Sequence, residues 1–337
     1  MTTTLVTGAA GFIGFHTAVR LLNSGHAVIG IDNLTDFYKI NLKQDRLEEL
    51  RTYDRFSFYE ATVADAANMN AVFEHHDIQN VIHLAGQAGV RAPPSESHRY
   101  VESNLVGFCN VMEASRAHKV AHFVYASSSS VYGMEAIPPF STDQSVDHPQ
   151  SLYAATKRAN ELLAHSYSYN YDLATTGLRF FTVYGPWGRP DMAVYKFTDL
   201  IAKGQPITLY GEGKLLRDFT YIDDVVDALV RVLENPPTSG YVGQTTPAKS
   251  KVAYRIYNVG NDQPVEVNEL VHLIEHALET TAVVRYKPPH PADLHTTHAD
   301  VKELTDVFDL QPNTNLKDGI AHFVEWYLQY HGRDESN

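Results

Sequence analysis

The chain is poor in cysteine, in basic residues and in long apolar segments. Cys109 is the one cysteine among 337 residues, which excludes an internal disulfide and a zinc site built from several cysteines. Lys and Arg number 27 against 40 Asp and Glu, so the net charge of −13 argues against nucleic-acid binding. The 17 histidines show no H-E-x-x-H spacing. With this cysteine count and histidine spacing, we expect no metal. Because no signal-like or membrane-spanning apolar run occurs, we expect a cytoplasmic protein with no membrane partner.

What the sequence does contain begins with a glycine turn. In TTLVTGAAGFIGFHTAVRLLNSGHAVIGIDN, a short β-branched run precedes Gly8, Gly11 and Gly14, and an amphipathic helix and a second apolar run follow. A strand, a glycine turn and a helix in this order place backbone N–H groups and a helix N-terminus against a dinucleotide pyrophosphate. Asp32, at the end of the second predicted strand, would accept a hydrogen bond from a ribose hydroxyl and repel a 2′-phosphate. The pattern therefore predicts NAD rather than NADP.

Three further short apolar runs occur at residues 80–85, 122–127 and 174–180. Helical stretches lie between them. Alternation of β and α segments at this spacing predicts an α/β fold with a Rossmann-type doubly wound parallel sheet.

The character of the sequence changes after about residue 180, where turn-rich pieces alternate with short helices. We expect residues 1–180 to form an NAD-binding domain, with returns from about 218–260. Residues 181–330 are expected to form most of a smaller, interleaved C-terminal α/β substrate lobe. The segment 234–251 is rich in Pro, Gly, Thr and Ser and is predicted to be a mobile surface loop.

A second motif places a tyrosine and a lysine one helical turn apart. Tyr153 and Lys157, in SLYAATKRANELL, lie on the same face of a predicted helix. A tyrosine with its usual pKa of about 10 is a poor base near neutrality, and a nearby ammonium stabilises the phenolate and lowers that pKa. The stretch YASSSSVYG ends a predicted strand, where a serine hydroxyl can hold the reacting oxygen. Together these groups predict a proton-transfer site.

Several motifs together resemble the extended short-chain dehydrogenase/reductases, and among them the nucleotide-sugar epimerases. They follow the family order over nearly the whole chain: GAAGFIG, HLAGQAGVR, YASSSSVYG, SLYAATK, LRFFTVYGPWGRPDM, RDFTYIDDVVDA and YNVGN. The resemblance implies a catalytic trio of Ser128, Tyr153 and Lys157, with Ser127 or Ser129 as alternatives for the serine. It also implies a UDP-sugar substrate and a homodimer. The cofactor-binding residues that it implies are Gly8, Gly11, Phe12, Ile13, Gly14, Asp32, Asn33, Val63, Leu84, Ala85, Gln87, Asn104, Tyr153 and Lys157.

The serines of YASSSSVYG bear on which reaction follows the first step. In the family, NAD takes a hydride from C4 of the sugar while the tyrosine takes the hydroxyl proton, which gives a 4-keto sugar. Related 4,6-dehydratases carry Asp-Glu before Val-Tyr-Gly, and related UDP-glucuronate decarboxylases carry a glutamate there. Ser129 and Ser130 occupy these positions, and a hydroxyl cannot replace a carboxylate as acid or base near neutral pH. The resemblance therefore implies hydride return to the opposite face, which is 4-epimerisation.

The turn GPWGRPDM is similar to that of the UDP-glucuronate 4-epimerases, where an arginine lies near the C6 carboxylate of the sugar. Arg189 occupies this position, and a planar guanidinium suits a carboxylate through paired charge-assisted hydrogen bonds. Thr182 falls where UDP-galactose epimerases usually have asparagine, and Arg217 matches a position that holds the UDP diphosphate. The substrate-binding residues implied are Arg91, Ser127, Ser128, Ser129, Thr182, Arg189, Arg217 and Asp293.

We therefore expect a UDP-glucuronate 4-epimerase. The enzyme alternatives are a UDP-glucose/UDP-galactose 4-epimerase, which Arg189 and Thr182 argue against, and a UDP-glucuronate decarboxylase, which lacks its glutamate here. From another class, a non-catalytic NAD-sensing or scaffold protein could retain the fold, although the intact Ser–Tyr–Lys set argues against it.

Some positions depart from the family pattern. Thr62 stands where many relatives have an aspartate that contacts adenine, and Asp65 or the backbone of Val63 are the candidates to replace it. The stretch HPADLHTT departs from the usual R-P-G-D at His290 and Ala292. Apolar residues in the helical stretches near 103–118 and 153–170 suit either the core or a homodimer interface: Leu105, Phe108, Met112, Leu162 and Leu163.

Overall fold

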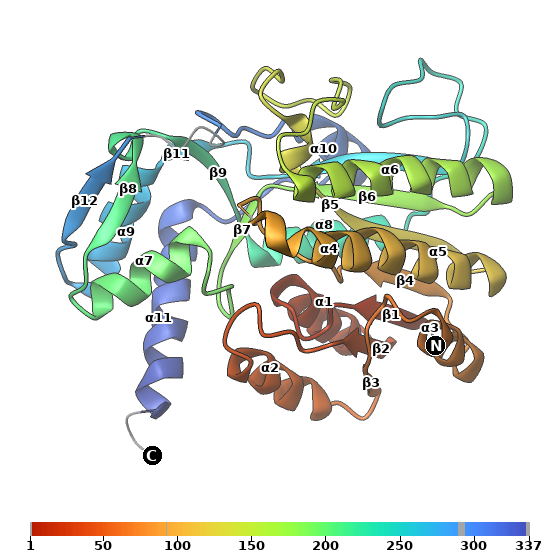
Figure 1. Ribbon diagram of the computed structural model, residues 1–337, viewed down its shortest axis with the longest axis horizontal. Helices are drawn as coiled ribbons and strands as arrows, with labels where there is room; N and C mark the ends of the chain where they lie inside the picture. Colours follow the sequence, from red (N-terminus) through yellow and green to blue (C-terminus); the bar gives the residue numbers. More distant parts are fainter. Residues whose placement is uncertain (1, 92, 289–293, 335–337) are drawn as a thin grey trace.

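The computed structural model of the protein describes residues 2–91, 93–288 and 294–334. Figure 1 follows this chain from its N-terminus to its C-terminus. His290, Ala292 and Asp293, three positions of interest in the sequence, lie outside the described residues.

A seven-stranded parallel sheet forms the centre of the larger part of the molecule (Figure 1). Its strands lie in the order β10-β6-β5-β4-β1-β2-β3, so the chain winds outward in both directions from β1. The predicted α/β fold with a doubly wound sheet is thereby confirmed. The strand bounds are β1 Thr3–Thr7, β2 Ala27–Asp32, β3 Phe56–Glu60, β4 Asn80–His83, β5 His122–Ser128, β6 Thr175–Phe180 and β10 Tyr254–Val259.

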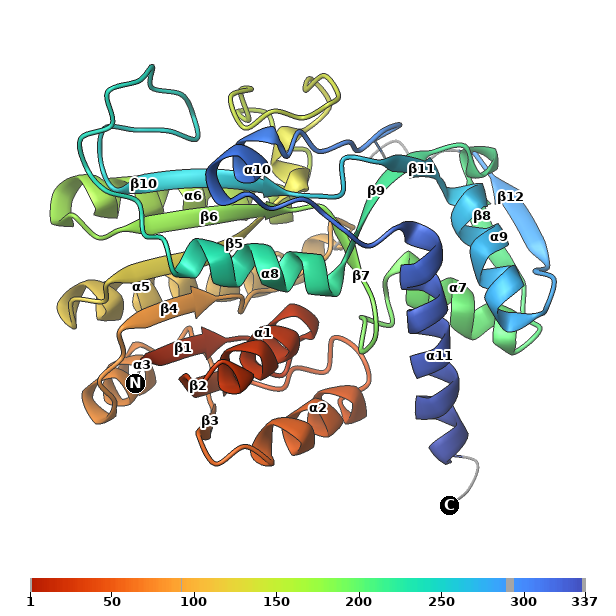
Figure 2. The same cartoon turned by 180° about the vertical axis from the view of Figure 1, so that it is seen from behind.

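Helices cover both faces of this sheet because successive strand residues point to opposite sides. In β1, Leu5 packs toward one apolar cluster and Val6 toward the other, and Phe123 and Val124 divide in the same way in β5. Figures 1 and 2 show the two helical layers from opposite sides. One layer contains α3 Ala66–His75, α5 Gly107–Ala117 and α6 Leu152–Tyr171; the other contains α1 Phe12–Asn23, α2 Asn41–Arg51 and α8 Ile222–Leu233.

Three short helical segments lie between β4 and α5. They are the 3-10 turn Pro94–Glu96, the helix α4 Ser97–Tyr100 and a π-helical stretch, Val101–Val106, that continues into α5. A further 3-10 turn, Ser129–Tyr132, follows β5. The first group and this turn therefore follow neighbouring strands at the carboxyl edge of the sheet.

The rest of the chain forms a smaller set of strands and helices beside the large sheet (Figure 1). A three-stranded sheet has the order β11-β9-β7, and β12 pairs with β8. The bounds are β7 Thr182–Tyr184, α7 Ala193–Ala202, β8 Ile207–Tyr210, the 3-10 turn Gly211–Gly213, β9 Leu216–Tyr221, β11 Pro264–Glu266, α9 Val267–Leu278, β12 Val284–Lys287, α10 Lys302–Phe308 and α11 Leu316–Asp334. Between β9 and β11 the chain returns to the large sheet as α8 and β10, within the stretch 218–260 where returns are expected.

The segment 234–251 divides into an exposed part and an anchored part. Val242 is 97% exposed, whereas Ala248 is fully buried and its carbonyl accepts a hydrogen bond from the Ile256 N–H at 3.0 Å. The segment therefore lies at the surface as predicted, and its second half is anchored to the edge strand β10.

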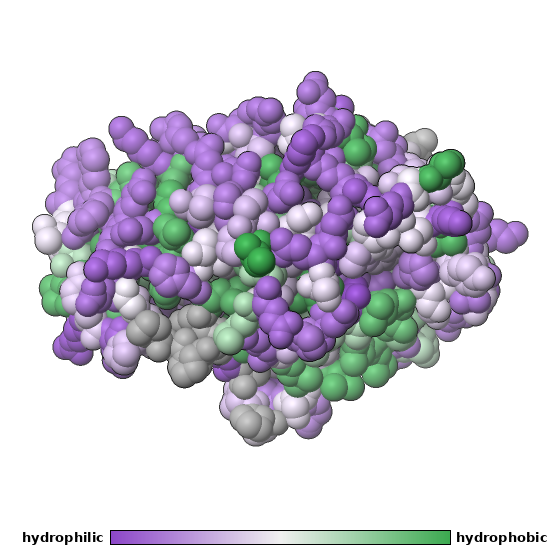
Figure 3. Space-filling model, turned by 90° about the horizontal axis from the view of Figure 1, so that it is seen from above, coloured by the Kyte–Doolittle hydropathy of each residue, from purple (hydrophilic) through white to green (hydrophobic). Residues whose placement is uncertain are grey.

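The face of the molecule shown in Figure 3 is largely hydrophilic, with separate apolar patches. Among residues expected in the core or at an interface, Phe108 and Met112 are fully buried, whereas Leu162 is 57% exposed. No helix among the described residues is both long and apolar enough to cross a membrane.

Candidate active site

The glycine turn between β1 and α1 is shaped by close backbone approach. Gly8 has a φ of +73°, and a Cβ on Gly14 would lie 2.1 Å from the Gly8 carbonyl oxygen, so only glycine fits. Gly11 begins α1 without a side-chain capping bond, and Phe12 and Ile13 form its first turn. The first N–H groups of the helix therefore have no side-chain acceptor and suit a pyrophosphate. This cradle fits NAD.

Asp32 lies at the end of β2 beside this turn. Its carboxylate accepts hydrogen bonds from the N–H groups of Ala10 at 3.2 Å and Leu34 at 2.9 Å. Lys43 Nζ lies 3.7 Å from the same carboxylate, and Asn33 is exposed. The backbone bonds fix the carboxylate of Asp32 next to the glycine turn, at a position suited to a cofactor ribose.

The loop after β4, which begins with Leu84 and Ala85, is held by Asn104. The side-chain oxygen of Asn104 accepts from the Gln87 N–H at 2.7 Å, and its amide donates to the Gln87 carbonyl and to the Thr156 hydroxyl, each at 3.0 Å. Asn104 is almost fully buried. Its polar atoms are thus used to hold this loop against α6, next to the expected cofactor site.

Asp65 and the backbone of Val63, the two candidates to contact adenine in place of an aspartate at position 62, already bond other parts of the protein. The Asp65 carboxylate caps α3 by accepting from backbone N–H groups at 2.9 and 3.1 Å. The Val63 carbonyl accepts from the Asn110 amide at 3.1 Å. This arrangement does not favour Asp65 as a replacement for the aspartate absent at Thr62.

Tyr153 and Lys157 lie one turn apart on α6 beside the end of β5. Lys157 Nζ donates to the Ala126 carbonyl at 2.9 Å and lies 5.9 Å from the centre of the Tyr153 ring. Burial lowers the pKa of Lys157 to about 8. Burial raises the pKa of Tyr153, and a hydrogen bond from Ser128 and the charge of Arg189 oppose the rise only in part. In the chain alone, burial therefore dominates the pKa of Tyr153, and the role of Lys157 in lowering it stays a prediction for the cofactor-bound protein.

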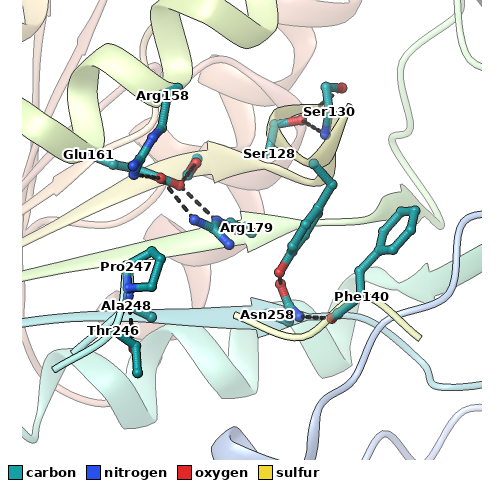
Figure 4. A network of polar contacts seen from close by, with 12 residues as sticks. Ser128, Ser130, Phe140, Arg158, Glu161, Arg179, Thr246, Pro247, Ala248 and Asn258 are labelled. Carbon is teal, nitrogen blue, oxygen red and sulfur yellow. Dashed lines mark hydrogen bonds and ion pairs between the residues drawn. The ribbon is translucent and has the colours of Figure 1, made fainter. Parts of the chain in front are cut away.

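The serines after β5 divide between two sides of the strand. The Ser128 hydroxyl donates to the Ser130 hydroxyl at 3.1 Å and accepts from the Ser130 N–H at 3.2 Å (Figure 4). Ser129 and Ser130 are half-buried. The hydroxyl of Ser127 instead donates to the Glu161 carboxylate at 2.6 Å, and Ser127 is 2% exposed. Its predicted contact with the sugar is therefore corrected to a role in the buried network behind the site.

That network is centred on a buried ion pair. Arg179 of β6 donates two hydrogen bonds of 2.9 Å to Glu161 of α6, and both side chains are fully buried (Figure 4). Arg158 donates to the same carboxylate at 3.1 Å. The Arg179 guanidinium also lies 4.8 Å from the centre of the Tyr132 ring. These contacts join α6 to β6 and to the strand β5 that ends in the serines.

Thr182 and Arg189 line one small pocket. Thr182 begins β7, two residues beyond Phe180, and Phe180 pairs with Ser128 in the large sheet. The sheet register therefore carries Thr182 just past the carboxyl edge at which the serines lie.

Arg189 lies near both an acidic residue and the tyrosine predicted to be catalytic. Its guanidinium donates to the Asp191 carboxylate at 3.0 and 2.6 Å and lies 5.6 Å from the centre of the Phe37 ring. Its charge is close enough to Tyr153 to favour the phenolate. The structure thus brings together Tyr153, Ser128, Thr182 and Arg189, which the sequence separates widely.

The remaining predicted substrate residues lie on other segments. The Arg91 guanidinium lies 5.4 Å from the centre of the Tyr210 ring, which joins the loop after β4 to β8. Arg217 of β9 donates to the carbonyls of Leu216 at 2.8 Å and His295 at 3.3 Å.

Sequence reasoning missed three charged residues that support the site: Lys43, Arg46 and Glu161. Helical periodicity could have found the first two, because Leu42, Lys43, Arg46, Leu47 and Leu50 form the buried face of α2. Glu161 lies at i+4 from Lys157 and so continues the face of α6 that carries the tyrosine and lysine predicted to be catalytic.

Comparisons with known proteins agree with this geometry. The model of the NAD dependent epimerase/dehydratase family matches residues 4–260. A probable UDP-glucuronate 4-epimerase of Rhizobium meliloti (strain 1021) is 42% identical over 98% of this chain and 98% of its own length. The crystal structure of UDP-glucuronic acid 4-epimerase from Bacillus cereus with UDP-glucuronic acid and NAD has a TM-score of 0.88 and 30% identity, covering 98% of this chain and 100% of that chain.

A solved UDP-glucose 4-epimerase is also similar. The Thermotoga maritima enzyme with UDP-glucose has a TM-score of 0.84 and 27% identity, covering 98% of this chain and 100% of that chain. Overall shape therefore does not separate the two sugars, and the residues at the site have to. The family match over most of the length and the full-length relative establish that this chain belongs to the NAD dependent epimerase/dehydratase family.

Proposed function

We propose that the protein is a UDP-glucuronate 4-epimerase, which interconverts UDP-glucuronate and UDP-galacturonate through a 4-keto intermediate. The observation that carries this proposal is the approach of Arg189, on the turn after β7, to Tyr153, where its charge favours the phenolate. A guanidinium so close to the proton-transfer group is suited to a substrate that brings a carboxylate of its own.

Tyr153 carries the proton in both halves of the reaction. Bound NAD supplies the hydride acceptor and donor, and its oxidised ring adds a positive charge that favours the phenolate. Tyr153 takes the proton of the C4 hydroxyl and returns it when C4 is reduced from the other face. The Ser128 hydroxyl, held by Ser130, hydrogen-bonds the same oxygen, and Lys157 keeps a cation behind the ring.

The site also has to prevent the 4-keto intermediate from losing CO2. A 4-keto glucuronate is a β-keto acid, and it decarboxylates when its carboxylate can leave along the direction of the carbonyl π system. We infer that Arg189 and Thr182, with Ser129, hold the carboxylate out of that geometry. The half-buried serines offer no carboxylate that could assist a second reaction.

A direct test is to incubate the purified protein, without added NAD, with UDP-glucuronate and separately with UDP-glucose. We expect UDP-galacturonate from the first sugar and no product from the second. A UDP-pentose would show that the serines do not prevent decarboxylation. UDP-galactose as the main product of the second incubation would reject the assigned substrate in favour of the neutral-sugar epimerase.

Replacing Arg189 with leucine tests the role of the guanidinium. We expect a higher KM for UDP-glucuronate and a larger share of CO2 and pentose product, because the carboxylate loses its charged partner. Unchanged turnover together with an unchanged product ratio would contradict the role proposed for Arg189. Arg231→Leu is a suitable control, since Arg231 is exposed in the last turn of α8, in the helical layer on the other face of the sheet.

We also propose that the chain forms a homodimer through the layer that contains α5 and α6. Val101, Val106 and Leu162 are 42%, 45% and 57% exposed on neighbouring helical segments, which supports an apolar contact there. Light scattering should give a dimer for the parent protein and a monomer for Leu162→Glu. A control variant, Val242→Glu in the exposed part of 234–251, should remain dimeric; equal masses for all three proteins would place the interface elsewhere.

A further inference from the structure

We propose that Arg46 is a positioning residue for substrate recognition, holding the turn that carries Arg189 against the glycine turn of the dinucleotide site. This inference rests on the proposed function, because it concerns how the carboxylate-binding arginine is placed. Arg46 lies on α2, within the first 50 residues of the chain and away from every motif of the catalytic site in the sequence.

The contacts of Arg46 link two functional turns. Its NH1 donates to the carbonyl of Ala10, in the glycine turn, at 2.8 Å, and its NH2 donates to the carbonyl of Trp187 at 2.5 Å. These two acceptors lie 36 and 141 residues away in the chain. Arg46 is fully buried, so the two bonds are made in a space from which water is excluded. One side chain therefore fixes the distance between the dinucleotide turn and the turn that leads to Arg189.

The turn around Trp187 needs such a support because its backbone is unusual. Trp187 has a φ of +61°, a left-handed conformation that is costly for a residue with a large side chain. His16 of α1 bonds the carbonyl of the preceding residue, Pro186, at 2.9 Å, and burial lowers the pKa of His16 to about 4. A neutral His16 and the cationic Arg46 thus hold two consecutive carbonyls of the turn, and Arg189 follows two residues later.

A second connection runs through adjacent aromatic residues in the loop after β2. Arg46 NH1 donates to the Tyr38 hydroxyl at 2.7 Å, and the guanidinium lies 5.7 Å from the centre of the Tyr38 ring. The neighbouring residue, Phe37, has its ring centre 5.6 Å from the Arg189 guanidinium. Backbone and ring contacts therefore both lead from Arg46 to Arg189.

The charge of Arg46 is what makes a purely structural explanation insufficient. Within the described chain, no carboxylate lies within ion-pair distance of Arg46, and its Nε has no hydrogen-bond partner. A buried cation without an anion is expensive, and an apolar side chain could fill the same space. The planar guanidinium instead donates in different directions to three oxygens, those of the Ala10 and Trp187 carbonyls and the Tyr38 hydroxyl, which a lysine cannot do. This arrangement is expected where the position of the oxygens matters.

Binding measurements in a Tyr153→Phe background test the inference without turnover. Arg46→Lys and Arg46→Met are combined with this background, and calorimetry gives the dissociation constants of UDP-glucuronate and of UDP-glucose. We expect about tenfold weaker binding of UDP-glucuronate, the equivalent of one or two lost charged hydrogen bonds, and less than about a twofold change for UDP-glucose. The NAD content of each protein, measured after denaturation, ensures that proteins with equal loading are compared.

A double-mutant cycle with Arg189→Leu decides whether Arg46 acts through Arg189. In an Arg189→Leu protein, Arg46→Lys should cause no further loss of UDP-glucuronate affinity, since the residue that it positions is gone. Arg51→Met, an exposed change on the same helix, is the matched control and should leave both ligands unaffected. If the Arg46 variants do not fold, Tyr38→Phe removes one of the same hydrogen bonds. It should weaken UDP-glucuronate binding more than UDP-glucose binding, with a smaller loss of affinity than the one expected for the Arg46 variants.

Two results would overturn the inference. Equal weakening of both ligands would make Arg46 a general support of the fold, and a further tenfold loss in the Arg189→Leu protein would make it independent of Arg189. If the parent Tyr153→Phe protein does not prefer UDP-glucuronate over UDP-glucose, the proposed function itself fails. That result is distinguishable because it appears before any change at Arg46.

Discussion

Replacing Glu161 with glutamine should lower the free energy of unfolding by about 3–5 kcal/mol, the range found when one partner of a buried ion pair is removed. Glutamine has the size of glutamate, so the change leaves no cavity and isolates the effect of charge. It does leave the Arg179 guanidinium fully buried with no anion bonded to it. Burial by itself raises the pKa of Glu161, yet the charge of Arg179 together with the hydrogen bonds from Arg179 and Ser127 and the charge of Arg158 lowers the net pKa, which shows how strongly this carboxylate depends on its partners.

The size of the loss follows from the bonds around the carboxylate. Glu161 accepts two bonds from Arg179, one from Ser127 and one from Arg158. A glutamine amide keeps one acceptor oxygen and turns its NH2 toward donors, so the Arg179 fork and the serine can no longer all be satisfied. The ring of Tyr132 still faces the guanidinium, and we expect this contact to offset only about 1 kcal/mol.

Urea denaturation followed by circular dichroism measures the effect. Glu113→Gln is the matched control, because Glu113 is also paired with an arginine, Arg116, but its side chain is 51% exposed. Exposed ion pairs of this kind contribute about 0–1 kcal/mol to stability. We expect a large fall in the urea midpoint for Glu161→Gln and a small one for Glu113→Gln. Equal shifts for the two variants would refute the reasoning that burial makes this pair sensitive.

Three further predictions concern the reaction, the cofactor and acid stability. Tyr153→Phe should reduce kcat by about 10²–10⁴-fold with retained folding, which chromatography of the products and circular dichroism would check. Gly14→Ala should yield protein with less bound NAD, since its Cβ would meet the Gly8 carbonyl at 2.1 Å, and unchanged NAD content after purification would contradict the proposed cradle. Burial lowers the pKa values of His16 and His122 to about 4 each. The unfolded chain therefore binds more protons below about pH 6.5, and stability should fall between about pH 6.5 and pH 4 by roughly 3 kcal/mol for each histidine. An unchanged urea midpoint at pH 7 and pH 5 would count against this.

Local patterns were sufficient to predict the strands that carry the site. The apolar run AVIGID coincides with β2, and the expected runs at 122–127 and 174–180 match β5 and β6 within one residue. These segments are short, buried on both faces and bounded by glycines or polar turns, which is the pattern of parallel strands. The glycine turn and the spacing of Tyr153 and Lys157 were equally local, so the core of the candidate site followed from neighbouring residues.

Features that depend on distant contacts could not be predicted in this way. The side of β5 on which Ser127 lies follows from strand alternation, but its partner Glu161 is known only once α6 is packed on the sheet. Likewise, the pKa of Tyr153 depends on how deeply the ring is buried and on where Ser128 and Arg189 lie. The periodicity of α2 places Arg46 on the buried face of the helix, but its partner, the Trp187 carbonyl, is known only once the distant turn is packed against that face.

The return of the chain to β10 has a consequence for engineering new specificities. Because this edge strand is built after β7, β8 and β9 and before β11 and β12, no single cut separates the large sheet from the smaller strands. A chimera that borrows the sugar-facing part of a relative must therefore exchange two sequence blocks and splice them at three junctions, before β7, after β9 and after β10. Recombination at one crossover point between β6 and β10 would pair most of one parent's sheet with the other parent's edge strand, so such hybrids should fold only between parents whose β6 and β10 surfaces match.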